Sequence, residues 1–155
     1  MPVHIEQLGP GFAGSINGLD LRNPLSEKEI IAVHEGMDKY AVLVFKRQSI
    51  TDAEQLQFSQ QLGTIEHAIG TSLREPKDFR LPSTFADVSN LDKDGKPFEI
   101  DDRRRLFAIG NRLWHSDSSF KVVPAKYSIL HAISVPSKGG NTEFAHTPSA
   151  YDELE

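Results

Sequence analysis

The sequence predicts a mainly β fold, a sandwich or jelly roll, preceded by helices in its N-terminal part. Two helix-start signatures of the form S/T-x-x-E occur early in the chain, at Ser26 and at Thr51. After residue 84 the chain consists of short apolar or alternating segments separated by turns that contain Gly or Pro. This order of helices followed by many short strand candidates favours a β domain decorated by N-terminal helices.

Three short strands are expected in the first 45 residues. The alternation in VHIEQ, residues 3–7, predicts a strand, and the glycine-rich residues 9–21 predict a turn followed by a second strand. AVLVF, residues 41–45, is a continuous apolar run rich in Val, which predicts a buried strand.

Each S/T-x-x-E signature predicts the start of a helix. Ser26 with Glu29, and Thr51 with Glu54, are spaced to form capping boxes, in which each side chain bonds a backbone N–H of the other. Gly63 suits the position just after the second helix. The apolar face of the first helix is expected to contain Ile30, Val33 and Met37.

The C-terminal half is expected to be built from strands. The strand candidates are residues 85–90, 96–100, 126–135 and 141–144. DKDG, residues 92–95, is a turn signal between the first two, and PSKGG, residues 136–140, turns the chain between the last two. Residues 64–84 contain two prolines and little periodicity, so we expect a long loop there.

The last nine residues predict the beginning of a helix, with Thr147 as N-cap and Pro148 at the first helical position. The sequence stops about two turns into this helix, where an isolated helix is marginal. We therefore expect the chain to be a portion of a longer protein.

Composition bounds the class of protein. The chain has 155 residues, which suits one domain, and a formal net charge of −5, which argues weakly against a nucleic-acid surface. It has no cysteine, so any metal must be held by His, Asp or Glu. We find no signal peptide and no apolar run of the ~20 residues that span a bilayer, so the expectation is a cytoplasmic protein with no membrane partner.

His115 and Asp117, in the stretch NRLWHSDSSF, are the candidate metal ligands. On an extended backbone, residues i and i+2 point to the same side, so this imidazole and this carboxylate can converge on one point. They would be two of the three ligands in the 2-His-1-carboxylate triad of non-haem Fe(II) oxygenases. From the tripeptide alone, a polar loop or a His–Asp hydrogen bond is the more common outcome. We expect the neighbouring Trp114 to be a packing residue.

The sequence around these residues resembles the taurine dioxygenase and 2,4-dichlorophenoxyacetate dioxygenase family, whose members are Fe(II)- and 2-oxoglutarate-dependent oxygenases. The resemblance rests on LWHSDSSF, on the YS that follows Lys126, and on GGNTEF at residues 139–144. It is stronger to the aryloxyalkanoate-degrading members. It reaches the N-terminus through INGLDLRNPLS, AVLVFKRQ and LGTIEH, so that it covers nearly all of the chain.

The resemblance implies a fold and a set of site residues. The fold would be a double-stranded β-helix, the clavaminate synthase-like jelly roll, with residues 1–155 as the N-terminal portion of one such domain. His115 and Asp117 match the first two iron ligands. Thr142 matches the threonine whose hydroxyl bonds the distal carboxylate of 2-oxoglutarate. Asn90 matches a position on the substrate side of the pocket, and His67 lies in the loop that contributes substrate contacts in the family. Three cations of the long loop could pair with an acidic substrate, although each is more simply a solvated charge: Arg74, Lys77 and Arg80.

Two elements of the family's site have no match in this chain. The third iron ligand is a second His far along the sequence, and the Arg after it pairs with 2-oxoglutarate. Three explanations stay open. The chain is a fragment, or it is a degenerate paralogue, or one of the histidines His67, His131 and His146 completes a different site. From the residues alone we expect His131 to be a core or half-buried histidine and His146 to be solvated.

The resemblance implies a dioxygenase of aromatic-compound catabolism that uses Fe(II), 2-oxoglutarate and O2. It would hydroxylate a small carboxylate or sulfonate and release succinate and CO2, and an aryloxyalkanoate such as 2,4-dichlorophenoxyacetate is the substrate class it suggests. The alternative is a catalytically incomplete fragment or paralogue that only binds a metal or ligand. A zinc hydrolase ranks below both, because no H-E-x-x-H occurs. The oligomeric state is left open, with a homo-oligomer as one alternative.

Overall fold

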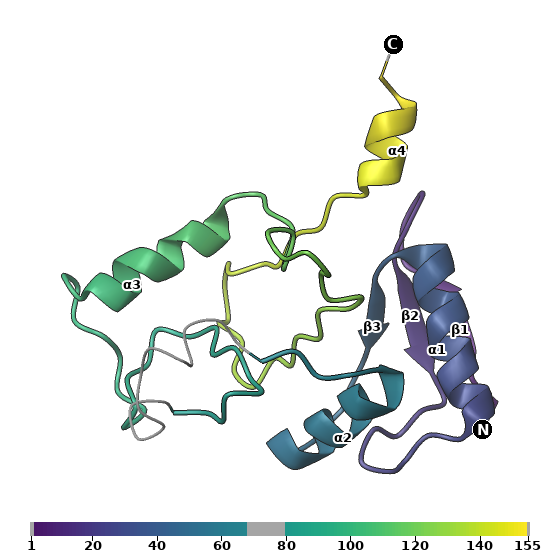
Figure 1. Cartoon of the computed structure of the whole chain (residues 1–155), viewed down its shortest axis with the longest axis horizontal. Helices are drawn as coiled ribbons and strands as arrows, with labels where there is room; N and C mark the ends of the chain where they lie inside the picture. The colour runs from purple at the N-terminus through teal and green to yellow at the C-terminus, as the bar shows by residue number, and fades with distance from the viewer. Residues whose placement is uncertain (1, 68–79, 155) are drawn as a thin grey trace. The chain divides into compact units, whose positions relative to one another are not determined.

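The computed structural model describes residues 2–67 and 80–154, and the central part of the predicted long loop, residues 68–79, lies outside them. Backbone contacts divide the chain into two compact units. The first unit contains Met1–Gly63 and Leu130–Glu155, and the second contains Thr64–Ile129. Figure 1 shows the elements of both along the chain. Among the described residues, no helix has the length and apolar character needed to cross a bilayer.

The N-terminal strands form a three-stranded sheet in the first unit, with the order β1-β2-β3 (Figure 1). Strand β1 (His4–Gln7) pairs antiparallel with β2 (Gly14–Asn17), and His4 lies opposite Asn17. Strand β3 (Leu43–Phe45) pairs parallel with β2, because helix α1 (Glu27–Tyr40) connects them as a crossover. The two predicted N-terminal strands are thus confirmed.

The expectation of a buried strand at 41–45 is only partly correct. A strand forms there, but Leu43 and Phe45 are half-buried and Val44 is 37% exposed. The reason is its place in the sheet: among the described residues β3 pairs only with β2, so one of its edges has no strand beside it. The buried strand is the central one, β2, in which Gly14, Ser15 and Ile16 are buried.

Both predicted helix starts are confirmed. Helix α1 follows Ser26, whose backbone N–H and hydroxyl both donate to the Glu29 carboxylate at 2.7 Å. Helix α2 (Asp52–Leu62) follows Thr51, whose Oγ1 accepts the Glu54 N–H at 3.3 Å while the Glu54 carboxylate accepts the Thr51 N–H at 2.7 Å. Gly63 follows α2 as expected, although its backbone is not in the left-handed conformation common at this position.

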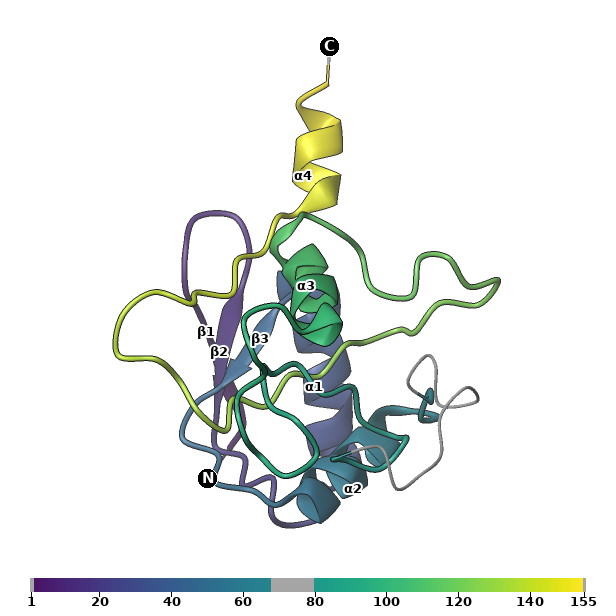
Figure 2. The same cartoon turned by 90° about the vertical axis from the view of Figure 1, so that its left-hand side faces the viewer.

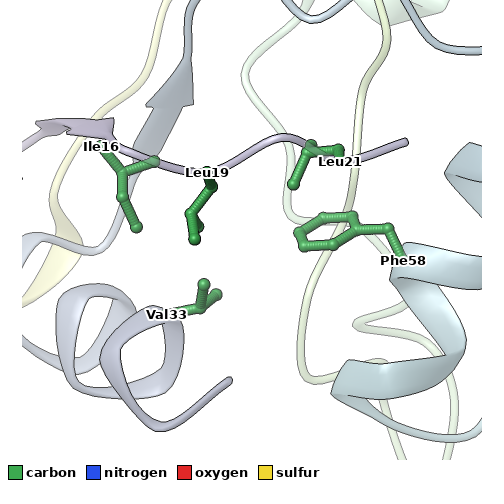
Figure 3. Packing of buried hydrophobic residues seen from close by; sticks show 5 residues of the cluster. All are labelled: Ile16, Leu19, Leu21, Val33 and Phe58. Atoms are coloured by element: carbon green, nitrogen blue, oxygen red, sulfur yellow. The ribbon is translucent and has the colours of Figure 1, made fainter. Parts of the chain in front are cut away.

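The core of the first unit lies between the sheet and the two helices. Val33 from α1 and Phe58 from α2 point toward the side chains of β2 and the loop after it (Figure 3). Helix α1 lies close to the sheet at Gly36, where an added Cβ would be 2.5 Å from Ile5 Cδ1. The buried cluster consists of Ile16, Leu19, Leu21, Val33 and Phe58. Of the predicted apolar face of α1, Val33 is therefore its buried centre.

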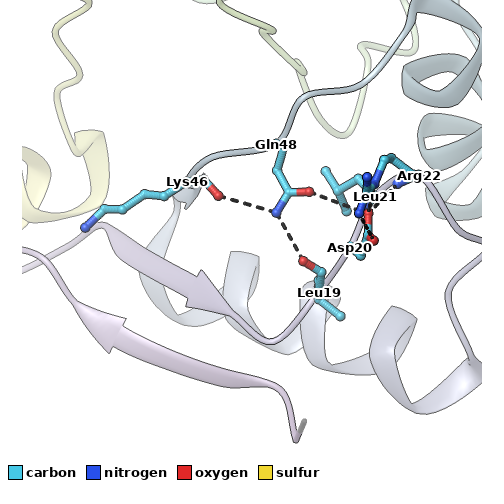
Figure 4. A network of polar contacts seen from close by, with 6 residues as sticks. All are labelled: Leu19, Asp20, Leu21, Arg22, Lys46 and Gln48. Atoms are coloured by element: carbon cyan, nitrogen blue, oxygen red, sulfur yellow. Dashed lines mark hydrogen bonds and ion pairs between the residues drawn. The ribbon is translucent and has the colours of Figure 1, made fainter.

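Gln48, just after β3, connects two distant parts of this unit (Figure 4). Its Oε1 accepts the N–H of Leu21 and its Nε2 donates to the carbonyl of Leu19, both at 3.1 Å. One side chain thus satisfies two backbone groups of a loop whose own leucines are buried. This loop carries two members of the core cluster, Leu19 and Leu21. The amide of Gln48 therefore helps to keep these two leucines in the core.

Replacing Gln48 by Leu is expected to lower the free energy of unfolding by about 1–3 kcal/mol, because it leaves two half-buried backbone groups without a partner. Urea unfolding followed by circular dichroism measures this. The matched control is Gln60→Ala on the exposed side of α2, for which a change within about 0.5 kcal/mol is expected. Equal stability of the two variants would contradict the assigned role of the amide.

Asp20, on the same loop, accepts two hydrogen bonds from the guanidinium of Arg22, at 2.8 and 2.7 Å (Figure 4). This side chain, and then the Arg22 backbone N–H, lower the pKa of Asp20 from 3.8 to about 2. A lowered carboxyl pKa adds stability that is complete above about pH 4 and is lost as the pH falls toward 2.

The variant Arg22→Ala is expected to raise the pKa of Asp20 toward 3.8 without reaching it, because the backbone N–H remains. An NMR titration of the Asp20 carboxyl carbon between pH 1.5 and pH 6 measures the change. Lys28→Ala on α1 serves as the charge-matched control and should leave the Asp20 pKa where it is. The two variants giving the same Asp20 pKa would refute this account.

The C-terminal half departs from the predicted strands (Figure 2). Residues 85–90, 126–135 and 141–144 contain no strand, and the predicted hairpin around 92–95 is reduced to one bridge between Leu91 and Pro97. The turn itself is present, since Gly95 N–H donates to the Asp92 carbonyl at 3.0 Å. An alternating pattern forms a strand only if another segment accepts its backbone hydrogen bonds, and the described residues supply none here.

Helical segments occupy part of this half instead. Helix α3 (Arg103–Ala108) continues into a 3-10 helix (Ile109–Arg112) in the second unit. Asp102 starts α3, because its carboxylate accepts the backbone N–H of Arg104 at 2.8 Å and pairs with its guanidinium. The predicted terminal helix is confirmed as α4 (Thr147–Asp152), but its N-cap is His146 and not Thr147. Since Thr147 is already helical, the predicted cap was wrong by one residue.

Candidate metal site

The structure brings His115 and Asp117 together in the second unit. His115 Nε2 lies 3.3 Å from Asp117 Oδ1, and about half of each side chain is exposed. The other ring nitrogen, Nδ1, lies 2.7 Å from the carbonyl oxygen of Leu113. A carbonyl oxygen can only accept, so Nδ1 carries the proton that it donates to Leu113. In the neutral imidazole the lone pair is then on Nε2, on the side of the Asp117 carboxylate.

This arrangement fits a divalent metal ion. A neutral Nε2 and a carboxylate oxygen both present lone pairs, so their approach is favourable only with a cation or a proton between them. Two neighbouring ligands that are each about 2.1 Å from a metal lie about 3 Å apart at a right angle. The observed separation of 3.3 Å is close to this value. A nitrogen and a carboxylate oxygen suit Fe(II), Mn(II) or Zn(II).

The candidate site consists of two side chains within the described residues, His115 and Asp117. No group of three His, Asp or Glu side chains there is arranged to hold a metal. His67 is not part of any such group among the described residues, and its Nδ1 lies 3.3 Å from Ser83 Oγ, with which it shares a hydrogen bond. The pair therefore provides two groups that could bind a metal ion, and any further ligands would have to come from outside the pair.

Residues 115–121, called the ligand loop below, are held by turns and by one distant carboxylate. The Lys121 N–H donates to the Ser118 carbonyl at 3.0 Å, and Ser118 has a left-handed backbone with φ of 55°. The Ser118 hydroxyl donates to Glu66 Oε1 at 2.8 Å, and Lys121 Nζ lies 2.6 Å from the same oxygen. Lys121 and then Ser118 lower the pKa of the Glu66 carboxyl. Glu66 lies 52 residues before Ser118.

The predicted substrate residues of the second unit are exposed. Asn90 is exposed, and its backbone carbonyl accepts the Phe98 N–H at 2.8 Å across the 92–95 turn. Arg80 forms two hydrogen bonds with Asp87, at 2.8 and 2.7 Å, so this cation is already paired inside the protein. Arg80 also lowers the pKa of Asp87. The other two loop cations named from the sequence, Arg74 and Lys77, lie outside the described residues.

In the first unit, Thr142 is exposed, and its role as a 2-oxoglutarate contact stays a prediction. His131 is half-buried as expected, and its buried Nδ1 has no hydrogen-bond partner among the residues that the structure describes. His146 is half-buried rather than fully exposed, because its ring stacks on Phe12 at 5.4 Å between centroids. The expectation that Trp114 is a packing residue is wrong for the described chain, since its side chain is 70% exposed.

The chain matches the family described as "Taurine catabolism dioxygenase TauD, TfdA family" over residues 4–155. It belongs to this family. The stretches that suggested the resemblance, from the N-terminal strands to the GGNTEF segment, lie within the matched range.

Similar proteins agree with the TauD/TfdA membership. The chain is 40% identical over 154 residues to an alpha-ketoglutarate-dependent 2,4-dichlorophenoxyacetate dioxygenase of Burkholderia sp. (strain RASC). The aligned region covers 99% of this chain and 52% of the relative. It is 28% identical to an (S)-phenoxypropionate/alpha-ketoglutarate-dioxygenase of Delftia acidovorans, with 99% and 49% covered. The chain thus spans about half the length of the curated relatives it matches.

A solved structure resembles the whole chain. The crystal structure of AAD-2 in complex with Mn(II) and N-oxalylglycine is 52% identical to it, with a TM-score of 0.92. The match covers 100% of this chain and 54% of AAD-2. The backbone described above is therefore similar to about half of a protein solved with a divalent metal.

Proposed function

We propose that this TauD/TfdA chain is part of an Fe(II)- and 2-oxoglutarate-dependent dioxygenase that hydroxylates a small anionic substrate. The observation that carries the proposal is the pairing of His115 Nε2 with Asp117 Oδ1, with the imidazole tautomer set by a backbone carbonyl. The substrate class we propose is an aryloxyalkanoate such as 2,4-dichlorophenoxyacetate. Support for this class comes from the Burkholderia relative, whose name states that substrate.

We further propose that residues 1–155 are the N-terminal portion of a single jelly-roll domain. The likeness to AAD-2 over the whole chain supports this, as does the share of about half that the chain covers of each relative. A second His ligand and an Arg for the distal carboxylate of 2-oxoglutarate would then lie in the remaining portion. Self-association into a homo-oligomer stays a prediction that light scattering can test.

The residues of this chain would act by binding and orienting. The His115 imidazole and the Asp117 carboxylate would bind the iron on one side, and the Leu113 carbonyl would keep the Nε2 lone pair available. Bound Fe(II), with 2-oxoglutarate and O2, would supply the oxidative step, in which one oxygen atom enters a substrate C–H bond and the other enters succinate as CO2 leaves. The Thr142 hydroxyl would donate to the distal carboxylate of 2-oxoglutarate, and Asn90 and His67 would contact the substrate.

A metal- or ligand-binding module without catalysis is the second candidate, favoured by the finding of only two ligands in the described residues. Succinate formation separates the two. The measurement uses the 155-residue chain and the complete product of its gene, each with Fe(II), 2-oxoglutarate, O2 and 2,4-dichlorophenoxyacetate, and with taurine in place of the aryloxyacetate. The proposal expects the complete product to form succinate only when Fe(II), 2-oxoglutarate and O2 are all present, and faster with the aryloxyacetate than with taurine. Metal binding with no succinate from either protein would establish the binding module.

A further inference from the structure

Glu66 forms the long-range contact of the ligand loop. Its Oε1 accepts the Ser118 hydroxyl at 2.8 Å and pairs with Lys121 Nζ at 2.6 Å. The two contacts reach the loop directly after Asp117, on both sides of a backbone turn closed by the hydrogen bond from Lys121 N–H to the Ser118 carbonyl. One carboxylate oxygen of Glu66 therefore holds the part of the loop that directly follows Asp117, the second proposed metal ligand.

The backbone of this turn needs such support. Ser118 has φ of 55°, a conformation that a residue with a Cβ adopts at a cost and keeps when its surroundings hold it. Among the described residues, the hydrogen bond to Glu66 is the contact that ties the Ser118 side chain to a distant segment. The side chains of Glu66 and Lys121 are about one-third exposed, so their ion pair is partly shielded from water. The lowered pKa of Glu66 agrees with a carboxylate that stays charged in this contact.

We propose that Glu66 is a positioning residue, which holds the ligand loop in a metal-ready conformation through Ser118 and Lys121. This inference rests on the proposed function of the His115–Asp117 pair as a metal site. Glu66 itself does not touch the metal. It acts through the backbone turn that follows Asp117, the residue whose Oδ1 lies 3.3 Å from His115 Nε2.

Two measurements on the 155-residue chain test the proposal. The first is the affinity for Mn(II) with 2-oxoglutarate present, obtained from the electron paramagnetic resonance signal of free Mn(II). The second is the hydrogen-exchange rate of the Lys121 amide without added metal. Glu66→Ala and Ser118→Ala should each weaken Mn(II) binding about tenfold, as losses of outer-shell partners do, and should speed Lys121 exchange by a similar factor. The double variant should bind Mn(II) no more weakly than Glu66→Ala alone, because both substitutions remove the same hydrogen bond between Ser118 and Glu66. Glu66→Gln, which keeps an acceptor for Ser118 but loses the charge facing Lys121, should lie between Glu66→Ala and the parent.

The control is Glu99→Ala, at an exposed position of the same unit, which should change neither readout. Unchanged Lys121 exchange in Glu66→Ala overturns the proposal, whatever the metal does. The proposal is also overturned if metal binding weakens while the urea midpoint falls and exchange becomes faster throughout the chain. Glu66 would then act on global stability. Absence of Mn(II) binding by the parent would count against the proposed metal site, while the exchange readout would still decide whether Glu66 holds the loop.

Discussion

Replacing Asp117 by Ala is expected to weaken Mn(II) or Fe(II) binding by more than about 100-fold. Loss of an outer-shell partner costs about 10- to 100-fold in metal affinity, and Asp117 is proposed as a direct ligand. Its carboxylate is also the anionic group that faces His115 Nε2 at 3.3 Å, so its removal leaves one neutral ligand for a divalent ion. Isothermal titration with Mn(II) in the presence of 2-oxoglutarate measures the loss. In the complete gene product, succinate formation should fall with it.

The matched control for this variant is Asp94→Ala, which removes an exposed carboxylate from the 92–95 turn of the same unit. It should bind metal like the parent. If the Asp94 and Asp117 variants lose affinity equally, the metal binds to surface carboxylates without preference, and the proposed site is wrong.

Phe58→Ala is expected to have the largest effect on stability, lowering the free energy of unfolding by about 3–5 kcal/mol. Phe58 is 3% exposed and its ring meets Phe45 edge-on, with 5.4 Å between centroids. It attaches α2 to the cluster under the sheet, so its truncation leaves a cavity between helix and strand (Figure 3). A loss of this size is a large part of the 5–15 kcal/mol that stabilises an ordinary domain.

Urea unfolding measures this change, with Phe144→Ala as the control. Phe144 is 56% exposed and belongs to the same unit, so its truncation should cost less than about 1 kcal/mol. The account of the core fails if the two truncations destabilise the chain to the same extent.

The helix starts of the N-terminal half were predicted well from the sequence. The residues that form each of them lie within a few positions of one another. The contacts of Ser26 with Glu29 and of Thr51 with Glu54 span three residues, so the sequence contains both partners of each cap. Val33 was found by its helical spacing and is 1% exposed. The edge position of β3 could not be found in this way, since the pattern of an apolar run does not say how many strands will pair with it.

The strands predicted after residue 84 show the limit of pattern alone. Residues 126–135 alternate well, yet Leu130, Ile133 and Val135 are each more than 60% exposed. Alternation specifies which side chains share a face, whereas a strand also needs backbone partners, which the described chain lacks at this segment. In the jelly roll proposed above, such partners would come from the rest of the domain. The exposure of these side chains in the structure agrees with that proposal.

The sequence predicted that His115 and Asp117 lie together, but it did not predict the groups that hold them, and their role as ligands stays a prediction. His115 and Asp117 follow from the His-x-Asp spacing and from the resemblance of LWHSDSSF. The Leu113 carbonyl that sets the tautomer of His115 is a backbone group. Every residue has such a group, so the residue types do not predict this contact. Glu66 lies 52 residues from Ser118, and a single acidic residue at that separation carries no periodicity or spacing signal. The contacts of the Leu113 carbonyl and of Glu66 are therefore visible only in the folded structure.

The central claim is that His115 and Asp117 form part of an iron site that binds 2-oxoglutarate. Its most direct test is an anaerobic titration of the chain with Fe(II) and 2-oxoglutarate, following the visible metal-to-ligand charge-transfer absorption. The account predicts a band in the parent chain that disappears in His115→Ala, with the metal positions beyond the two ligands filled by 2-oxoglutarate and solvent. A band of equal intensity in His115→Ala, or no band in either the chain or the complete product of its gene, would contradict it.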